Sequence, residues 1–133
     1  MERILVAYDG GAPARRALEL AADLATKFGA SVGVVSVVPY DPGRSPVAPW
    51  DDGTTHAQEL QEARTFLLEH KIEAEFLEPS GDPATTIERI AANGHFDTVI
   101  VGSRGLGALS RFLQGSVSEH VATHADATVI VTR

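Results

Sequence analysis

The sequence contains no cysteine and no long hydrophobic run. Without cysteine the chain has neither disulfides nor thiolate ligands for a metal. No apolar run approaches the roughly 20 residues of a membrane-spanning helix. The opening residues, MERILVAYDGG, lack the apolar length and the cleavage pattern of a signal peptide, so we expect a soluble, cytoplasmic protein. A chain of 133 residues, 44% of them hydrophobic, suits one compact domain over residues 1–133.

Positive charge is also scarce. Eleven Lys and Arg residues stand against 18 Asp and Glu residues, which gives a formal net charge of −7 at pH 7. This balance excludes a general attraction to nucleic acid or to an anionic membrane, because either polyanion would be repelled at long range. We expect neither partner, and any anion that binds must be held by a local site.

Five segments have the composition of β-strands. Residues 4–8, 32–38 and 98–101 are apolar on both faces, which is typical of central parallel strands covered by helices on both sides. Residues 72–76 alternate apolar side chains with glutamate, and residues 128–132 are short and flanked by threonine. These last two segments suit the edges of a sheet.

Four segments between the strands carry helical periodicity or capping patterns. Apolar side chains recur at helical spacing through residues 14–28, and the other three segments combine capping residues with apolar faces. We expect four helices. The first has Pro13 in its first turn and stops at Gly29, and the second opens at Thr55 with a capping box to Gln58. The third has Asp82 as N-cap, Pro83 at its first position and Gly94 after its end, and the fourth runs from Ser116 to about His124.

The alternation of five strands and four helices predicts an α/β fold. We expect a single doubly wound domain, with a five-stranded parallel sheet in the order 3-2-1-4-5 and helices on both faces. The chain then reverses direction between the first and fourth strands, and ligands of open sheets collect outside the carboxyl ends of strands at such a point. Asp9, Gly10 and Gly11 leave the first strand there, and residues 102–105 leave the fourth.

One region has no periodicity. Residues 39–53, PYDPGRSPVAPWDDG, contain four prolines and two glycines and follow the second strand on the side of the expected crevice. A connection of this length is typical of functional or mobile loops. A lid over the ligand and a solvated loop are both open interpretations.

Glycines gather after the fourth strand. Gly102 and Gly105 are separated by two residues, nine more precede Gly115, and Ser116 follows directly. Missing side chains let successive backbone N–H groups converge on an anion. The stretch then enters a helix, whose N-terminus favours phosphate. A tight turn needs only one or two glycines, so the wider spread favours a phosphate-binding loop.

Two arginines lie within this stretch. Arg104 and Arg111 would add charge-assisted contacts in a chain that is otherwise acidic. The spacing differs from the P-loop, which needs a Gly-Lys-Ser/Thr end, and from the dinucleotide fingerprint, which follows the first strand of the sheet.

These segments resemble the universal stress protein family, in the branch that binds ATP. The resemblance covers nearly the whole chain and rests on ILVAYDG at the start, VSVVP after the second strand, SGDPATTI before the third helix, the Gly-x2-Gly-x9-Gly-Ser spacing and a final VIV. It implies a domain that binds ATP together with Mg²⁺ and that forms homodimers through the last strand.

The resemblance also implies roles for particular residues. Asp9 would face the ribose or a phosphate-bound Mg²⁺, and backbone groups near Ala7 and Val37 would pair with the edge of the adenine. Gly102 and Gly105 would make room for the ribose and phosphates. Phosphate would be held through the N–H groups of Gly115, Ser116 and Val117 and through the Ser116 hydroxyl. To these expected site residues we add Arg104, as the charged contact described above.

Several of these patterns also have purely structural explanations. Ser116 and Glu119 have capping-box spacing, and a cap needs no ligand. His120 and His124 share a helix face at metal-ligand spacing, but no third ligand stands nearby, so we expect no metal site. No serine, histidine and acid arrangement suggests a catalytic triad. We predict no catalytic residue and at most slow ATP hydrolysis.

The sequence therefore predicts an ATP-binding universal stress protein that acts as a nucleotide-dependent regulatory or protective module in stress response. Two other classes stay open. One is a dimeric interaction scaffold of the same fold that binds no nucleotide. The other is an enzyme of the adenylating pyrophosphatase type, which would need a Ser-Gly-Gly-x-Asp-Ser loop where this chain has DGGAPA.

Overall fold

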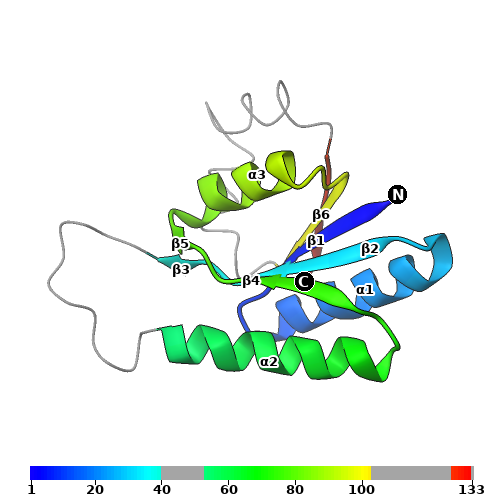
Figure 1. The fold of residues 1–133 in the computed structure, drawn as a ribbon, viewed down its shortest axis with the longest axis horizontal. Helices are drawn as coiled ribbons and strands as arrows, with labels where there is room; N and C mark the ends of the chain where they lie inside the picture. Colours follow the sequence, from blue (N-terminus) through cyan, green and yellow to red (C-terminus); the bar gives the residue numbers. More distant parts are fainter. Residues whose placement is uncertain (40–52, 103–126, 133) are drawn as a thin grey trace, which may run out of the picture.

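The computed structural model describes residues 1–39, 53–102 and 127–132, which form a five-stranded parallel sheet with helices on both faces (Figure 1). The strands of this sheet are β1 (Arg3–Ala7), β2 (Ser31–Val35), β4 (Ala74–Leu77), β6 (Thr98–Gly102) and β7 (Thr128–Thr132). They lie in the order β4-β2-β1-β6-β7. This confirms the predicted order 3-2-1-4-5, and the two segments predicted as edges are the edges.

Three helices of the described segments cover the sheet. α1 (Ala12–Phe28) and α2 (Gly53–Glu69) lie on one face, and α3 (Pro83–Asn93) lies on the other (Figure 1). The fourth predicted helix, from Ser116 to about His124, falls outside the described residues.

The side chains of β1 divide the core between the two faces. Ile4 and Val6 are fully buried in a cluster with the apolar sides of α1 and α2. Leu5 is buried on the opposite face, in a cluster that includes Ile87 and Ala91 of α3. Successive strand residues point to opposite faces, so a strand that is apolar throughout needs helices on both sides.

The helix boundaries agree with the capping predictions at three ends. Asp82 caps α3, since its carboxylate accepts a hydrogen bond from the Thr85 N–H at 3.1 Å. Gly94 follows the end of α3. Gly29 ends α1 in the left-handed conformation, with φ of 68° and its N–H donated to the carbonyl of Ala25. Glycine adopts this conformation without the steric cost that a Cβ imposes.

The helix starts agree with the predictions in one case and differ in another. The N-cap of α1 is Gly11, so Pro13 occupies the second helical position, within the first turn as predicted. Proline fits this position, because the N–H groups of the first turn have no partner within the helix. α2 already begins at Gly53, so Thr55 lies inside the helix and the capping box was misplaced.

The predicted strand over residues 32–38 is two strands. β2 stops at Val35, and a short β3 (Val38–Pro39) pairs in parallel with β5 (Ser80–Gly81) in a separate two-stranded sheet. Ser36 stands between them, buried, with its hydroxyl donated to Glu59 Oε2 at 3.2 Å. A buried hydroxyl needs a partner, and α2 supplies it.

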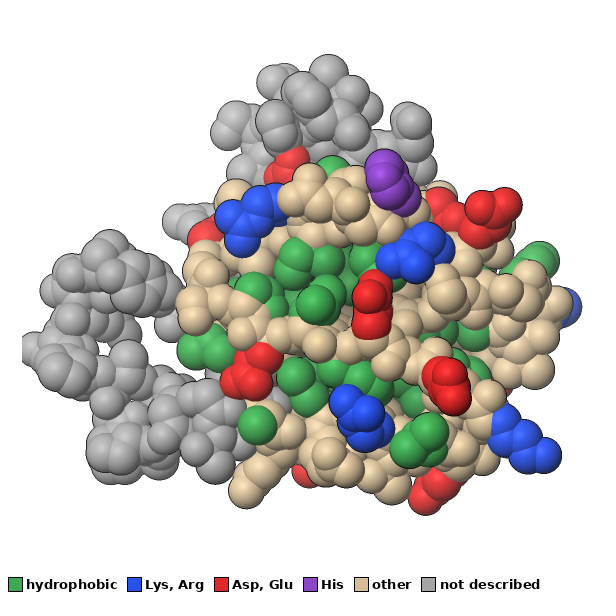
Figure 2. Space-filling model, viewed as in Figure 1, with side chains coloured by type: hydrophobic (Ala, Val, Ile, Leu, Met, Phe, Trp, Pro, Cys, Tyr) green, Lys and Arg blue, Asp and Glu red, His purple; other side chains and the backbone are tan. Residues whose placement is uncertain are grey.

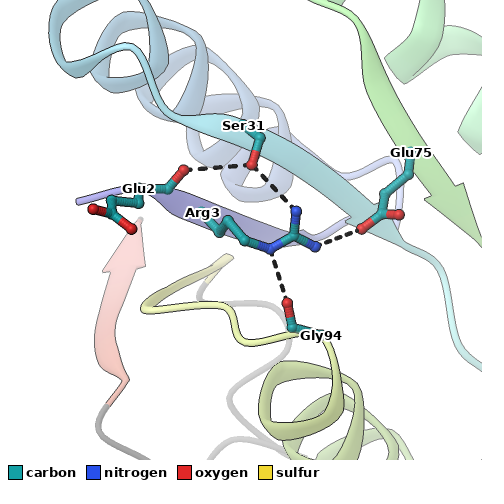
Figure 3. Close-up of polar contacts among 5 residues, drawn as sticks. All are labelled: Glu2, Arg3, Ser31, Glu75 and Gly94. Carbon is teal, nitrogen blue, oxygen red and sulfur yellow. Dashed lines mark hydrogen bonds and ion pairs between the residues drawn. The ribbon is translucent and has the colours of Figure 1, made fainter.

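The amino ends of the strands are joined by one arginine. Arg3 donates from Nε to the Gly94 carbonyl at 2.8 Å and pairs with Glu75 of β4 at 3.0 Å (Figure 3). Its guanidinium also lies 4.4 Å from the ring centre of Phe96 and 3.4 Å from the Ser31 hydroxyl. This polar cluster lies at the end of the sheet opposite to the predicted site, so we assign it to structure.

Asp97 also helps to fix this end. Burial raises the pKa of its carboxyl. Hydrogen bonds from the Glu2 N–H, the Thr98 hydroxyl and the Arg3 N–H lower the pKa by more than burial raises it, so the net shift is downward. The carboxylate therefore stays ionised at neutral pH and binds the start of β1 to the start of β6.

Candidate functional site

Three predicted site residues meet at the carboxyl ends of the central strands. Asp9 follows β1, Val37 follows β2, and Gly102 is the last residue of β6. β1 pairs with β2 on one side and with β6 on the other, so these positions are neighbours along one edge of the sheet. We call it the carboxyl edge. The connection after β1 leads to β2 on one side, and the connection after β6 leads to β7 on the other, so this edge is the switch point at which open sheets bind ligands.

A tight turn places Asp9 at this edge. The Gly11 N–H donates to Asp9 Oδ1 at 2.8 Å, and Gly10 between them has φ of 80°, a conformation that favours glycine. Asp9 itself is exposed. The carboxylate is therefore oriented by the backbone while it still faces solvent, as a residue that contacts a ligand must.

The N-terminus of α1 opens onto the same turn. Gly11 caps the helix without a side-chain hydrogen bond, and the first turn contains no acidic residue. No side chain of the first turn therefore neutralises the partial positive charge of the helix N-terminus. A pocket of about 290 Å³ lies beside it and is lined by Asp9, Gly10, Gly11, Arg15, Gln58, Glu59 and Glu62.

The two residues expected to contact adenine differ in setting. Ala7 ends β1 and is in register with Val35 on one side and Val101 on the other, so it lies inside the ladder of the sheet. Val37 is half-buried and lies between β2 and β3, outside both sheets. Of the two, Val37 is the residue whose backbone lies outside the strand pairing.

Gly102 packs against α1. A Cβ built on this buried glycine would lie 2.7 Å from the Ala14 nitrogen and 2.8 Å from the Pro13 carbonyl carbon. These are backbone atoms of the first turn of α1, and they leave no room for a methyl group. The glycine therefore has a packing reason that sequence reasoning did not find, and its role in making room for ribose or phosphate stays a prediction.

The remaining predicted site residues cannot be placed. Arg104, Gly105, Gly115, Ser116 and Val117 lie outside the described residues, as does the loop of residues 40–52. Within the described segments, no group of three or more His, Asp or Glu side chains is arranged to hold a metal ion.

A polar group next to the carboxyl edge was missed from the sequence. Tyr8 is buried beneath α1 and α2 and donates its hydroxyl to Glu62 Oε2 at 3.4 Å. Burial raises the pKa of Tyr8, and the neighbouring Glu62 adds to the rise while Arg15 opposes it. Tyr8, Arg15 and Glu62 share a second pocket of about 280 Å³ between the two helices. In the sequence Tyr8 ends an apolar run, and its hydroxyl was the one feature that could have indicated a polar contact.

The family model described as the universal stress protein family matches residues 1–133. The chain belongs to the universal stress protein family. A universal stress protein of Thermus aquaticus is 30% identical over 98% of this chain and 97% of its own length. The family resemblance read from the sequence motifs is thereby confirmed.

Solved structures of universal stress proteins share the fold. One in complex with cAMP is 20% identical, covers 99% of this chain and 97% of its own, and has a TM-score of 0.70. One from Archaeoglobus fulgidus in complex with dAMP is 25% identical, covers 100% and 98%, and has a TM-score of 0.67. In the described part of this universal stress protein, no helix combines the length and apolar character needed to cross a membrane.

Proposed function

We propose that this universal stress protein binds ATP with Mg²⁺ at the carboxyl edge and acts as a nucleotide-dependent regulatory or protective module in stress response. One observation carries the proposal: at the switch point, a backbone-oriented carboxylate and a helix N-terminus without a side-chain cap lie side by side. A polar ligand with both hydroxyls and phosphates matches that pair.

Because the chain is acidic overall, a nucleotide must be held by groups at a local site. The net charge is −7, so the protein as a whole repels a polyphosphate. Binding must then come from local donors, namely the α1 N-terminus and the glycine-rich residues after β6. Mg²⁺ would reduce the repulsion, and its preference for oxygen ligands fits the exposed carboxylate of Asp9.

The solved relatives support an adenine nucleotide as the ligand. The two structures with the same fold hold cAMP and dAMP, which share the adenine base and differ in sugar and phosphate. Val37 would offer its backbone to that base. Following the family resemblance, Gly105 would make room for the ribose and phosphates. The phosphates would be held by the amides of Gly115, Ser116 and Val117 and by the Ser116 hydroxyl, with Arg104 as a charged contact.

Isothermal titration calorimetry of the purified protein with ATP and Mg²⁺ tests the proposal. We expect one nucleotide per chain, a Kd in the micromolar range and a rise in melting temperature, because a ligand that binds only the folded state stabilises it. GTP under the same conditions is the control and should bind more weakly. No heat and no thermal shift with any adenine nucleotide would favour the dimeric scaffold instead.

We also propose that the protein forms a homodimer through β7. This edge strand exposes Val131 at 36% of its surface, and its neighbours Val129 and Ile130 are only half-buried. The opposite edge strand, β4, carries charge itself: Glu75 is paired with Arg3, and Figure 2 shows acidic and basic side chains among the hydrophobic ones on the face that carries β4. Charged edges resist strand pairing.

Sedimentation velocity tests the dimer. The wild-type protein should sediment with twice the chain mass of 14.1 kDa. Val131→Lys should shift it to the monomer, because a charged side chain on an edge strand opposes pairing. Glu73→Lys, a change at another exposed position, next to β4, should leave the dimer intact. A wild-type monomer, or a dimer lost only in the Glu73 variant, would contradict this arrangement.

A further inference from the structure

The first turn of α1 is held by the ends of two strands that lie far from it in sequence. The Thr132 hydroxyl, at the end of β7, donates to the Pro13 carbonyl at 2.7 Å across 119 positions of the chain. Gly102, at the end of β6, is in register with Thr132 and lies directly under the same turn. Both contacts act on the two residues Pro13 and Ala14.

The two contacts constrain the helix in different ways. Gly102 sets how closely the turn approaches the sheet, because backbone atoms of the turn occupy the place where a Cβ would stand. A packing contact of this kind does not by itself stop the turn from sliding along the strands. The Thr132 hydrogen bond is directional and fixes the turn laterally. The Val101 carbonyl lies 3.5 Å from the same hydroxyl, so the stronger bond is the one to Pro13.

The position of this turn determines the position of Asp9. Only Gly10 and Gly11 separate Asp9 from the helix, and the Asp9 carboxylate is oriented by the Gly11 N–H. Gly11 also accepts the Arg15 N–H at its carbonyl, at 3.0 Å, as part of the first turn. Any displacement of the turn therefore moves the carboxylate and the helix N-terminus together.

We infer that Thr132 is a positioning residue for the carboxyl edge: its hydroxyl holds the first turn of α1 so that Asp9 and the helix N-terminus point into the nucleotide site. Thr132 acts through α1, and we assign it no contact with the ligand. The inference rests on the proposed nucleotide site. It adds to that proposal a residue that lies in the last strand, outside the glycine-rich motif.

The test compares Thr132→Val with Thr132→Ser and a matched control. Valine keeps the shape and removes the hydroxyl, whereas serine keeps the hydroxyl. Thr65→Val is the control, because it also removes a bond from a threonine hydroxyl to a carbonyl, at 3.0 Å, but within α2 alone. Each variant is measured by amide hydrogen exchange without nucleotide and by calorimetry with ATP and Mg²⁺, at a temperature where all are folded.

We expect Thr132→Val to speed exchange at the hydrogen-bonded amides of Gly11 and Arg15 by about fivefold to tenfold, the effect of one hydrogen bond, and to weaken ATP binding by a similar factor. Thr132→Ser should restore both values, and Thr65→Val should change neither. Faster exchange with unchanged affinity would show a merely structural bond and overturn the inference, as would unchanged exchange. Failure of the wild-type protein to bind ATP would instead overturn the proposed function, while the exchange data would still report whether the hydroxyl holds the turn.

Discussion

Replacing Gly102 with alanine should destabilise the fold by about 3 kcal/mol, and valine should prevent stable folding. The added Cβ would lie 2.7 and 2.8 Å from backbone atoms of Ala14 and Pro13, and backbone atoms cannot move aside as a flexible side chain can. The whole first turn of α1 would have to lift off β6. Urea unfolding followed by circular dichroism measures the change.

Gly29→Ala is the matched control for this prediction. It adds the same methyl group at the other end of α1, where nothing lies within 4 Å of the new atom. Its cost should be about 1 kcal/mol, from the left-handed backbone alone. Equal losses in the two alanine variants would contradict the close packing of α1 on Gly102.

Replacing Gly115 with valine should abolish ATP binding and leave the fold intact. The expected reason is that a β-branched side chain would stand where phosphate approaches the amides of residues 115–117, at the second half of the Gly-x2-Gly-x9-Gly-Ser spacing. Gly115 lies outside the described residues, so the sequence pattern carries this prediction. Calorimetry with ATP and Mg²⁺ measures the loss.

Two further variants sharpen the result. Gly115→Ala should bind ATP with an intermediate affinity, because its smaller side chain blocks less of the approach. The melting temperature and circular dichroism spectrum of both variants should match those of the wild-type protein. Full affinity in Gly115→Val would remove this glycine from the site, and a collapsed melting temperature would show a structural glycine of the kind found at Gly102.

The two glycines show what sequence can predict about this site. Their spacing placed both glycines in one phosphate-binding loop, because a sequence pattern shows where side chains are missing but not what lies opposite them. The contact of Gly102 with α1 joins residues some ninety positions apart, and no local pattern reports such a contact. The Thr132 bond to Pro13 escaped prediction for the same reason.

The order of the main sheet was predictable because the burial of each strand is reflected in the apolar or polar character of its own residues. Strands apolar on both faces must be central, and the two strands with polar character must be edges, which leaves few arrangements once right-handed crossovers are required. Asp82 and Gly29 were predictable as helix ends because capping depends on neighbouring residues. The break at Ser36 was missed because a single serine in an apolar run is compatible with a continuous strand until its partner, Glu59, is known.

A crystal structure of the protein grown with ATP and Mg²⁺ tests the central claim most directly. We expect the nucleotide at the carboxyl edge, with the adenine against Val37, the ribose or metal at Asp9, and the phosphates on the amides of residues 115–117. A nucleotide bound elsewhere would contradict the account. So would amides of residues 115–117 that are already bonded to the protein's own carbonyls.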